Sequence, residues 1–109
     1  MLIRNVIERI TGENRLRELA RTVAQSCGDA IWTRVEGGIE NMSTPEARGY
    51  VRGRAGIIVR RQVSTAAQHN EVKPSRHSRL LELTMQSVID GMIQRKLAHT
   101  HVPALKRAA

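Results

Sequence analysis

Hydrophobic residues recur every three or four positions along most of the chain, which is the spacing of one face of an α-helix. The clearest stripe spans residues 13–34, where apolar side chains fall within about 120° of a helical wheel and charged ones take the opposite side. Its members are Leu16, Leu19, Ala20, Val23, Cys27, Ala30 and Ile31. This pattern predicts an amphipathic helix over residues 13–36, packed on one side.

Two further stripes flank this segment. Residues 1–10 carry the first, and residues 78–98 carry the second. The stripe positions are Ile3, Val6, Ile7 and Ile10 in the first and Leu81, Met85, Val88, Ile89 and Met92 in the second. Gly12 suits a left-handed helix cap, so it is expected to separate the first helix from the second.

A strong helix start stands at residues 43–46. Ser43 or Thr44 is able to accept free backbone amides, and Pro45 fits the first helical position because its missing N–H has no role there. Glu46 meets the positive end of the helix dipole. A third helix is therefore predicted from Pro45 to about residue 66.

Glycine makes this third helix unusual. Gly49, Gly53 and Gly56 each cost about 1 kcal/mol against alanine in a helix interior, and their spacing places them in one bare stripe. One interpretation is a helix whose glycines allow another backbone to approach closely. The alternative is a β-hairpin over residues 50–64, which the β-branched run at residues 57–59 favours. The helix is the preferred interpretation, because it agrees with the start signal.

These elements predict an all-α fold of about four helices, at residues 1–10, 13–36, 45–66 and 78–98. The polar residues 67–78, which include a proline, are expected to form a loop. Residues 1–98 form the predicted single domain, and residues 99–109 are expected to be a flexible basic tail. The arrangement is expected to be an irregular bundle or an open helical hairpin that completes its core by self-association or docking; the alternative is an α+β fold with the hairpin.

Composition explains why partners are expected. The chain has 109 residues with no Phe, one Trp and one Tyr, so aliphatic side chains must supply nearly all of the core. An isolated monomer with such a core would have low thermodynamic stability, and assembly into an oligomer or a larger complex would compensate for it. The single cysteine excludes an internal disulfide, and the longest apolar run is far too short to cross a bilayer. A cytoplasmic location is expected.

Positive charge is concentrated in one third of the chain. The formal net charge is +8, and residues 44–79 carry eight basic and two acidic residues, or +6 of that total. The basic residues of this region are Arg48, Arg52, Arg54, Arg60, Arg61, Lys73, Arg76 and Arg79. Such side chains release counterions from a nucleic acid backbone and bind it with little regard to sequence.

The first functional hypothesis is therefore a non-enzymatic protein that contacts the backbone of DNA or RNA through these residues, without base-specific readout. Base stacking is not expected, because only two aromatic residues of the stacking type are present. The alternative is a structural or adaptor subunit of a larger protein assembly that uses the same helix for protein contacts. The first hypothesis requires that the arginines of residues 48–61 are not already paired with the chain's own carboxylates.

No catalytic constellation is visible, so an enzyme is not expected, and neither is a cofactor. His99 and His101 with Cys27 or His69 form a weak candidate for a metal site, since structural zinc takes four ligands at tighter, paired spacings. Cys27 lies on the apolar stripe of its helix, which predicts a small packed side chain rather than a nucleophile.

Overall fold

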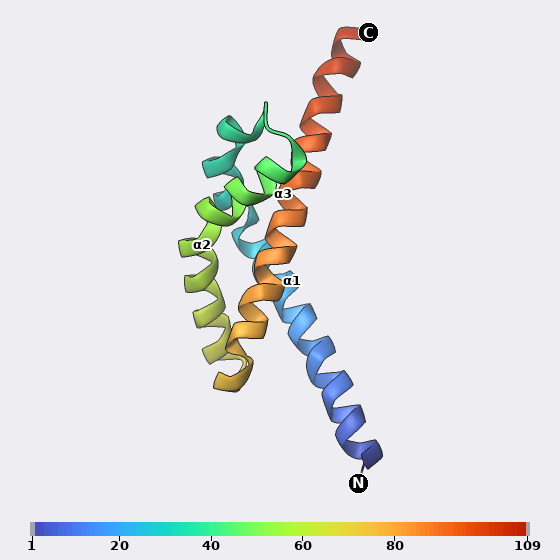
Figure 1. Cartoon of the computed structure of the whole chain (residues 1–109), viewed down its shortest axis with the longest axis vertical. Coiled ribbons are helices and arrows are strands. Elements are labelled where there is room, and N and C mark those ends of the chain that lie inside the picture. Colours follow the sequence, from blue (N-terminus) through green and yellow to red (C-terminus); the bar gives the residue numbers. More distant parts are fainter. Residues whose placement is uncertain (1, 109) are drawn as a thin grey trace.

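The chain folds into three long helices in the computed structural model, which describes the backbone of residues 2–108 and the side chains of residues 12–99. Helix α1 spans Leu2–Ile39, α2 spans Thr44–His69 and α3 spans His77–Ala108, with a short 3-10 turn at Pro74–Arg76. In Figure 1, α1 and α3 run in the same general direction. Helix α2, which lies between them in the sequence, runs in the opposite direction. No strand occurs in the described residues, so the fold is all-α.

The prediction of four helices is wrong, because residues 1–10 and 13–36 belong to a single helix. Gly12 lies within α1 and does not adopt the positive φ that a glycine cap requires. A glycine inside a helix costs only about 1 kcal/mol against alanine, too little by itself to end a continuous hydrogen-bonded helix. The side chains of the first predicted stripe lie outside the described residues.

The helical interpretation of residues 50–64 is confirmed, and the alternative hairpin is wrong. Ser43 precedes α2, and its hydroxyl accepts from the Glu46 amide (3.4 Å) while donating to the Glu46 carboxylate (2.8 Å). The core-facing residues of α2 recur every four positions: Ala47, Val51, Ala55, Val59, Val63 and Ala67. This uninterrupted buried row outweighs the helix-weakening glycines on the other faces.

The connection between α2 and α3 is shorter than the loop predicted at residues 67–78. Helix α2 continues to His69, and only residues 70–73 lie between its end and the 3-10 turn. Helix α3 continues through residues 99–108, for which the sequence predicted a tail. The flexibility of that segment stays a prediction.

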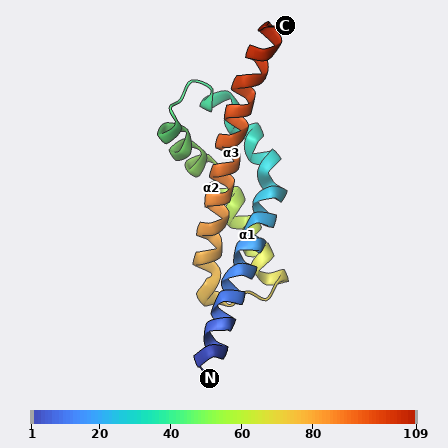
Figure 2. The same ribbon diagram turned by 90° about the vertical axis from the view of Figure 1, so that its right-hand side faces the viewer.

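The helices cross one another instead of lying side by side along their whole lengths (Figure 2). Buried residues step by four along each helix, as in the row Leu80, Thr84, Val88 and Met92 of α3. Rows with this spacing form the ridges that pack at crossing angles of roughly 50°. Because the long helices cross, their ends extend past the core, and the molecule measures 62 × 27 × 22 Å.

The core is aliphatic, as the composition predicts. Ile31, Ile39 and Leu80 are its largest fully buried side chains, and Cys27 is buried among them, as its place on the stripe predicted. One member of the stripe predicted over residues 13–34 differs from expectation, because Ala30 is exposed. Among the residues that the structure describes, no helix is long and apolar enough to cross a membrane.

Candidate functional site

The four-residue repeat of α2 sorts its side chains into rows. The row one position after the core row contains Arg48, Arg52 and Arg60. This row faces α3, as the hydrogen bonds from Arg48 and Arg52 to residues of that helix show. The row opposite the core contains Gly49, Gly53, Ile57 and Arg61, and all four are exposed. The basic residues of α2 therefore lie on different faces of the helix.

Arg48 and Arg52 are paired with carboxylates of α3, and this contact is called the α2–α3 seam. Arg48 donates to Asp90 Oδ1 (3.0 Å) and to Gln86 Oε1 (3.2 Å), and Arg52 donates to Glu82 Oε1 (3.2 Å). Two cations face two carboxylates, so the seam carries no net charge. Two of the residues predicted to bind nucleic acid are thus already engaged within the chain.

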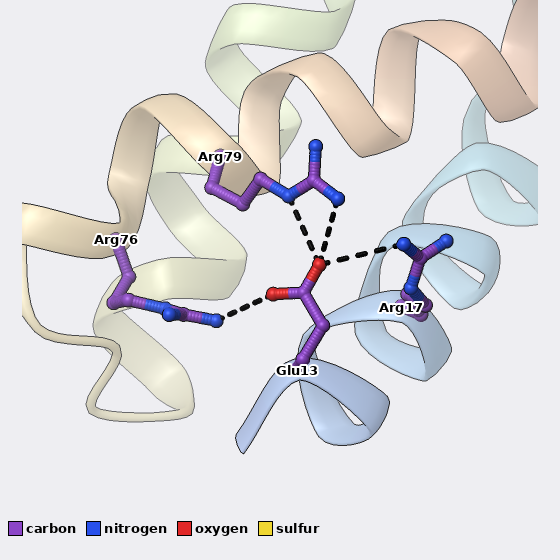
Figure 3. A network of polar contacts seen from close by, with 4 residues as sticks. All are labelled: Glu13, Arg17, Arg76 and Arg79. Atoms are coloured by element: carbon purple, nitrogen blue, oxygen red, sulfur yellow. Dashed lines mark hydrogen bonds and ion pairs between the residues drawn. The ribbon is translucent and has the colours of Figure 1, made fainter. Parts of the chain in front are cut away.

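A second group of arginines surrounds one carboxylate, as Figure 3 shows. Arg76 donates to Glu13 Oε2 (2.7 Å), while Arg79 donates to Oε1 through Nε (3.0 Å) and Nη2 (2.7 Å). Arg17, one helical turn further along α1, lies 3.5 Å from the same Oε1. Glu13 therefore ties the start of α3 to α1.

Glu13 is held in its charged form by these contacts. The hydrogen bonds from Arg79 lower the pKa of the Glu13 carboxyl, Arg76 lowers it further, and partial desolvation opposes them. Three guanidinium groups around one carboxylate leave an excess of positive charge. The cluster is therefore a paired but still cationic part of the surface.

Three of the predicted basic residues differ from these, because their charged side chains are unpaired among the described residues. Arg60, Arg61 and Lys73 are exposed, and within the described residues none of their side chains forms an ion pair or hydrogen bond. Arg54 is also exposed, and its guanidinium lies 5.1 Å from the centre of the Tyr50 ring. The arginines of residues 48–61 are thus partly engaged and partly free, and the free ones lie mainly in the second half of α2.

Arg60, Arg61 and Lys73 belong to one end of the bundle, here called the turn end: residues 12–19 of α1, residues 60–69 of α2 and residues 70–79. Seven basic and three acidic residues lie in these segments, for a net charge of +4. The basic residues are Arg15, Arg17, Arg60, Arg61, Lys73, Arg76 and Arg79. Half of the formal +8 is therefore gathered at one end of an elongated molecule.

Of the glycine stripe, Gly49 and Gly53 are exposed and do not pack against another part of the described chain, while Gly56 is buried. A β-carbon added at Gly49 or Gly53 would meet nothing within 4 Å, and one at Gly56 would meet only the Arg60 guanidinium, at 3.7 Å. The close approaches occur at other glycines. At Gly28 a β-carbon would lie 3.2 Å from Arg95 of α3, and at Gly38 it would lie 2.6 Å from Tyr50 Cζ of α2.

Sequence reasoning missed the partners of the arginines and one exposed apolar residue. The charges of Glu82 and Asp90 are visible in the sequence, but their pairing with α2 depends on the register of two antiparallel helices. Ile57 is 62% exposed, although it belongs to an apolar run. Its position two residues after buried Ala55 is the signal for this exposure, since that step places it opposite the core.

Metal and thiol chemistry find little support in the described residues. Within the described part of the chain, no group of three or more His, Cys, Asp or Glu side chains is placed to hold a metal ion. His99 instead packs 5.0 Å from Trp32, and the side chain of His101 lies outside the described residues. Cys27 is buried, and desolvation raises the pKa of its thiol. A raised pKa disfavours the nucleophilic thiolate.

Comparison with protein-family models, with curated proteins and with solved structures finds no match for this chain.

Proposed function

We propose that this protein is a non-enzymatic helical protein that binds the phosphate backbone of nucleic acid through its turn end. The observation that carries the proposal is the free state of Arg60, Arg61 and Lys73, which are exposed and unpaired among the described side chains. Free cations are able to exchange their counterions for phosphates without first breaking an internal bond.

The other predicted basic residues contribute to the proposed binding to different extents. Arg76 and Arg79 lie at the same end and share Glu13, so they add positive potential more than direct contacts. Arg48 and Arg52 are neutralised at the seam and are left out of the binding surface. The surface lacks a stacking platform, so the contact is expected to follow the backbone and not the base sequence.

The test is binding of a fluorescently labelled 20-base-pair duplex, followed by anisotropy over a series of salt concentrations. The wild-type affinity is expected to fall steeply with salt, with a slope of about −0.9 per phosphate contact. Arg60→Ala/Arg61→Ala is expected to weaken binding roughly tenfold and to reduce the slope by about two contacts.

A matched control removes the same charge from another place. Arg21 and Arg34 of α1 are exposed and, among the described side chains, unpaired, so Arg21→Ala/Arg34→Ala lowers the net charge equally. A smaller loss for this control supports a local surface. Equal losses for both double variants, or no binding by the wild type at low salt, would refute the proposal.

Ile57 favours a second candidate, a structural or adaptor subunit that makes protein contacts through the outer row of α2. Ile57 is 62% exposed. It lies one helical turn from Gly53, where an added β-carbon would meet nothing within 4 Å, so this row offers a flat surface with one apolar side chain. Sedimentation velocity tests this candidate with Ile57→Ser and Gly53→Leu. Both variants are expected to disrupt assembly more than helix content by circular dichroism, and a monomeric wild type would count against self-assembly.

A further inference from the structure

A groove of about 940 Å³ lies between α1 and the turn that joins α2 to α3. Residues 12–22 form one wall and residues 70–76 form the other. Its volume falls within the range of about 300–1,000 Å³ that is typical of small-molecule sites. Neither Arg60 nor Arg61 lines it, but Arg15, Lys73 and Arg76 of the turn end do, so the groove is separate only from the α2 part of the surface proposed above.

The apolar part of the groove lining is aliphatic. Leu16 is buried, Leu19 and Val72 are half-buried, and Gly12 leaves open space at one end. No aromatic residue lines the groove, so it offers nothing for a ring or a base to stack on. An extended hydrocarbon chain matches such a surface better, because its burial needs area and not ring geometry.

The rim of the groove has a small excess of positive charge. Arg15, Lys73 and Arg76 contribute three cations, and Glu18 and Glu71 contribute two carboxylates. This formal charge of +1 includes Arg76, whose guanidinium is paired with Glu13, so Arg15 and Lys73 are the rim cations left for a ligand with one negative charge. The two carboxylates would repel a polyanion, so the same groove is poorly suited to a nucleic acid backbone.

The wall formed by the turn is held in place by its own hydrogen bonds. The Val72 amide donates to the Ala67 carbonyl (2.9 Å), and the His77 ring bonds to the Val72 carbonyl (2.9 Å). Glu71 has a φ of 51°, in the left-handed region that glycine usually occupies at a helix end. This geometry carries Val72 onto the groove, so the apolar lining exists before any ligand arrives.

We propose that this groove binds a single-chain amphiphile with a monoanionic head group. The chain lies along α1 over Leu16 and Leu19, and the head group lies between Arg15 and Lys73. The ten-residue step from Gly12 to Thr22 covers about 15 Å, which accommodates a chain of about ten to twelve carbons. A fatty acid and a lysophospholipid with one phosphodiester share this chemistry.

Isothermal titration calorimetry on the full chain tests the proposal with 12-carbon probes kept below their micelle concentrations. Dodecanoate is expected to bind one per chain, with a Kd on the order of 10 µM. Lauroyl lysophosphatidylglycerol binding equally well would show that the head group is read by charge alone, and dodecanoate binding alone would assign the site to fatty acids. Dodecyltrimethylammonium and acetate, which lack the anion or the chain, are expected to bind at least tenfold more weakly.

Gly12→Leu fills the groove without removing a charge or a core contact. A β-carbon at Gly12 meets nothing within 4 Å, and leucine favours a helix more than glycine does, so the variant is expected to fold. Dodecanoate affinity is expected to fall at least tenfold. Gly37→Leu is the matched control, since Gly37 is also an open, exposed position of α1 outside the groove.

Arg15→Ala tests the head group, with Arg21→Ala as its control. Loss of dodecanoate binding in Arg15→Ala but not in Arg21→Ala would support the groove. Arg60→Ala/Arg61→Ala leaves every groove residue in place and is expected to keep dodecanoate binding, so the failure of either proposal is seen separately. Unchanged affinity in Gly12→Leu, or equal binding of the cationic amphiphile, would overturn the proposal. No binding of either anionic probe would also overturn it.

Discussion

The two ends of α2 carry similar numbers of arginines but differ in whether those arginines are paired with carboxylates. At the seam, Arg48 and Arg52 face Glu82 and Asp90, and the charges cancel. At the turn end, Glu13 is shared by three arginines, while Arg60 and Arg61 have no carboxylate partner among the described side chains. A basic sequence segment is therefore not the same as a basic surface, because the neighbouring helix decides which charges remain available.

The largest effect is expected from the core that both regions share. Leu80 is fully buried one residue after Arg79, and Leu80→Ala should lower the free energy of unfolding by about 2–5 kcal/mol. Urea unfolding followed by the fluorescence of Trp32, the only tryptophan, measures this loss. Leu97→Ala, at a side chain that is 50% exposed, should cost far less. Two separate transitions in Leu80→Ala would show that the turn end and the seam unfold independently.

Glu13→Gln tests the shared carboxylate of the turn end. The variant should melt at a lower temperature than the wild type at pH 7, because the ties to Arg76 and Arg79 lose their charge. It should also bind duplex several-fold more tightly, since two arginines are released toward phosphates. Weaker duplex binding would show that Glu13 orients these arginines instead of competing for them.

The same variant has a defined pH dependence. The pKa of Glu13 is lowered from an ordinary value of 4.5, so the folded state binds its proton less readily than the unfolded state does. Its stabilising contribution is present above pH 4.5 and is lost as the pH falls through the folded-state pKa. Thermal melts from pH 7 to pH 3 should therefore show the difference between wild type and variant shrinking below pH 4.5. A constant difference would contradict this assignment.

Glu71→Gly should stabilise the turn end without touching the seam. Glycine adopts the φ of 51° without steric cost, and the gain is expected to be about 0.5–1 kcal/mol after the greater freedom of glycine in the unfolded chain is counted. Chemical denaturation measures the change. Glu71→Ala removes the same carboxylate but keeps the β-carbon, so an equal gain in that variant would point to charge and not to backbone strain.

The smallest effect is expected at the seam. Arg48→Ala/Arg52→Ala breaks two half-exposed ion pairs, each contributing about 0–1 kcal/mol to stability. Duplex binding should be nearly unchanged, in contrast to Arg60→Ala/Arg61→Ala, which should keep its stability and lose its binding. Loss of binding in the seam variant would show that its arginines leave their carboxylates for phosphate.

The sequence by itself determined the helical fold, the start of α2 at its serine cap and the aliphatic core with Cys27 inside it. Each of these follows from short-range rules: residue spacing, capping hydrogen bonds and the apolar character of a stripe. Local rules fail at Gly12, because the low helix propensity of glycine predicts a helix boundary there although α1 continues through it.

Only the tertiary structure decided which arginines stay free and which glycines lie in tight contacts. Arg48 meets Asp90 across 42 positions of sequence, and Arg79 meets Glu13 across 66. Such pairs depend on helix register and crossing, because a shift of one residue turns a side chain by about 100° around its helix. Spacing within one helix shows which residues share a face, but the partner that covers that face comes from another helix.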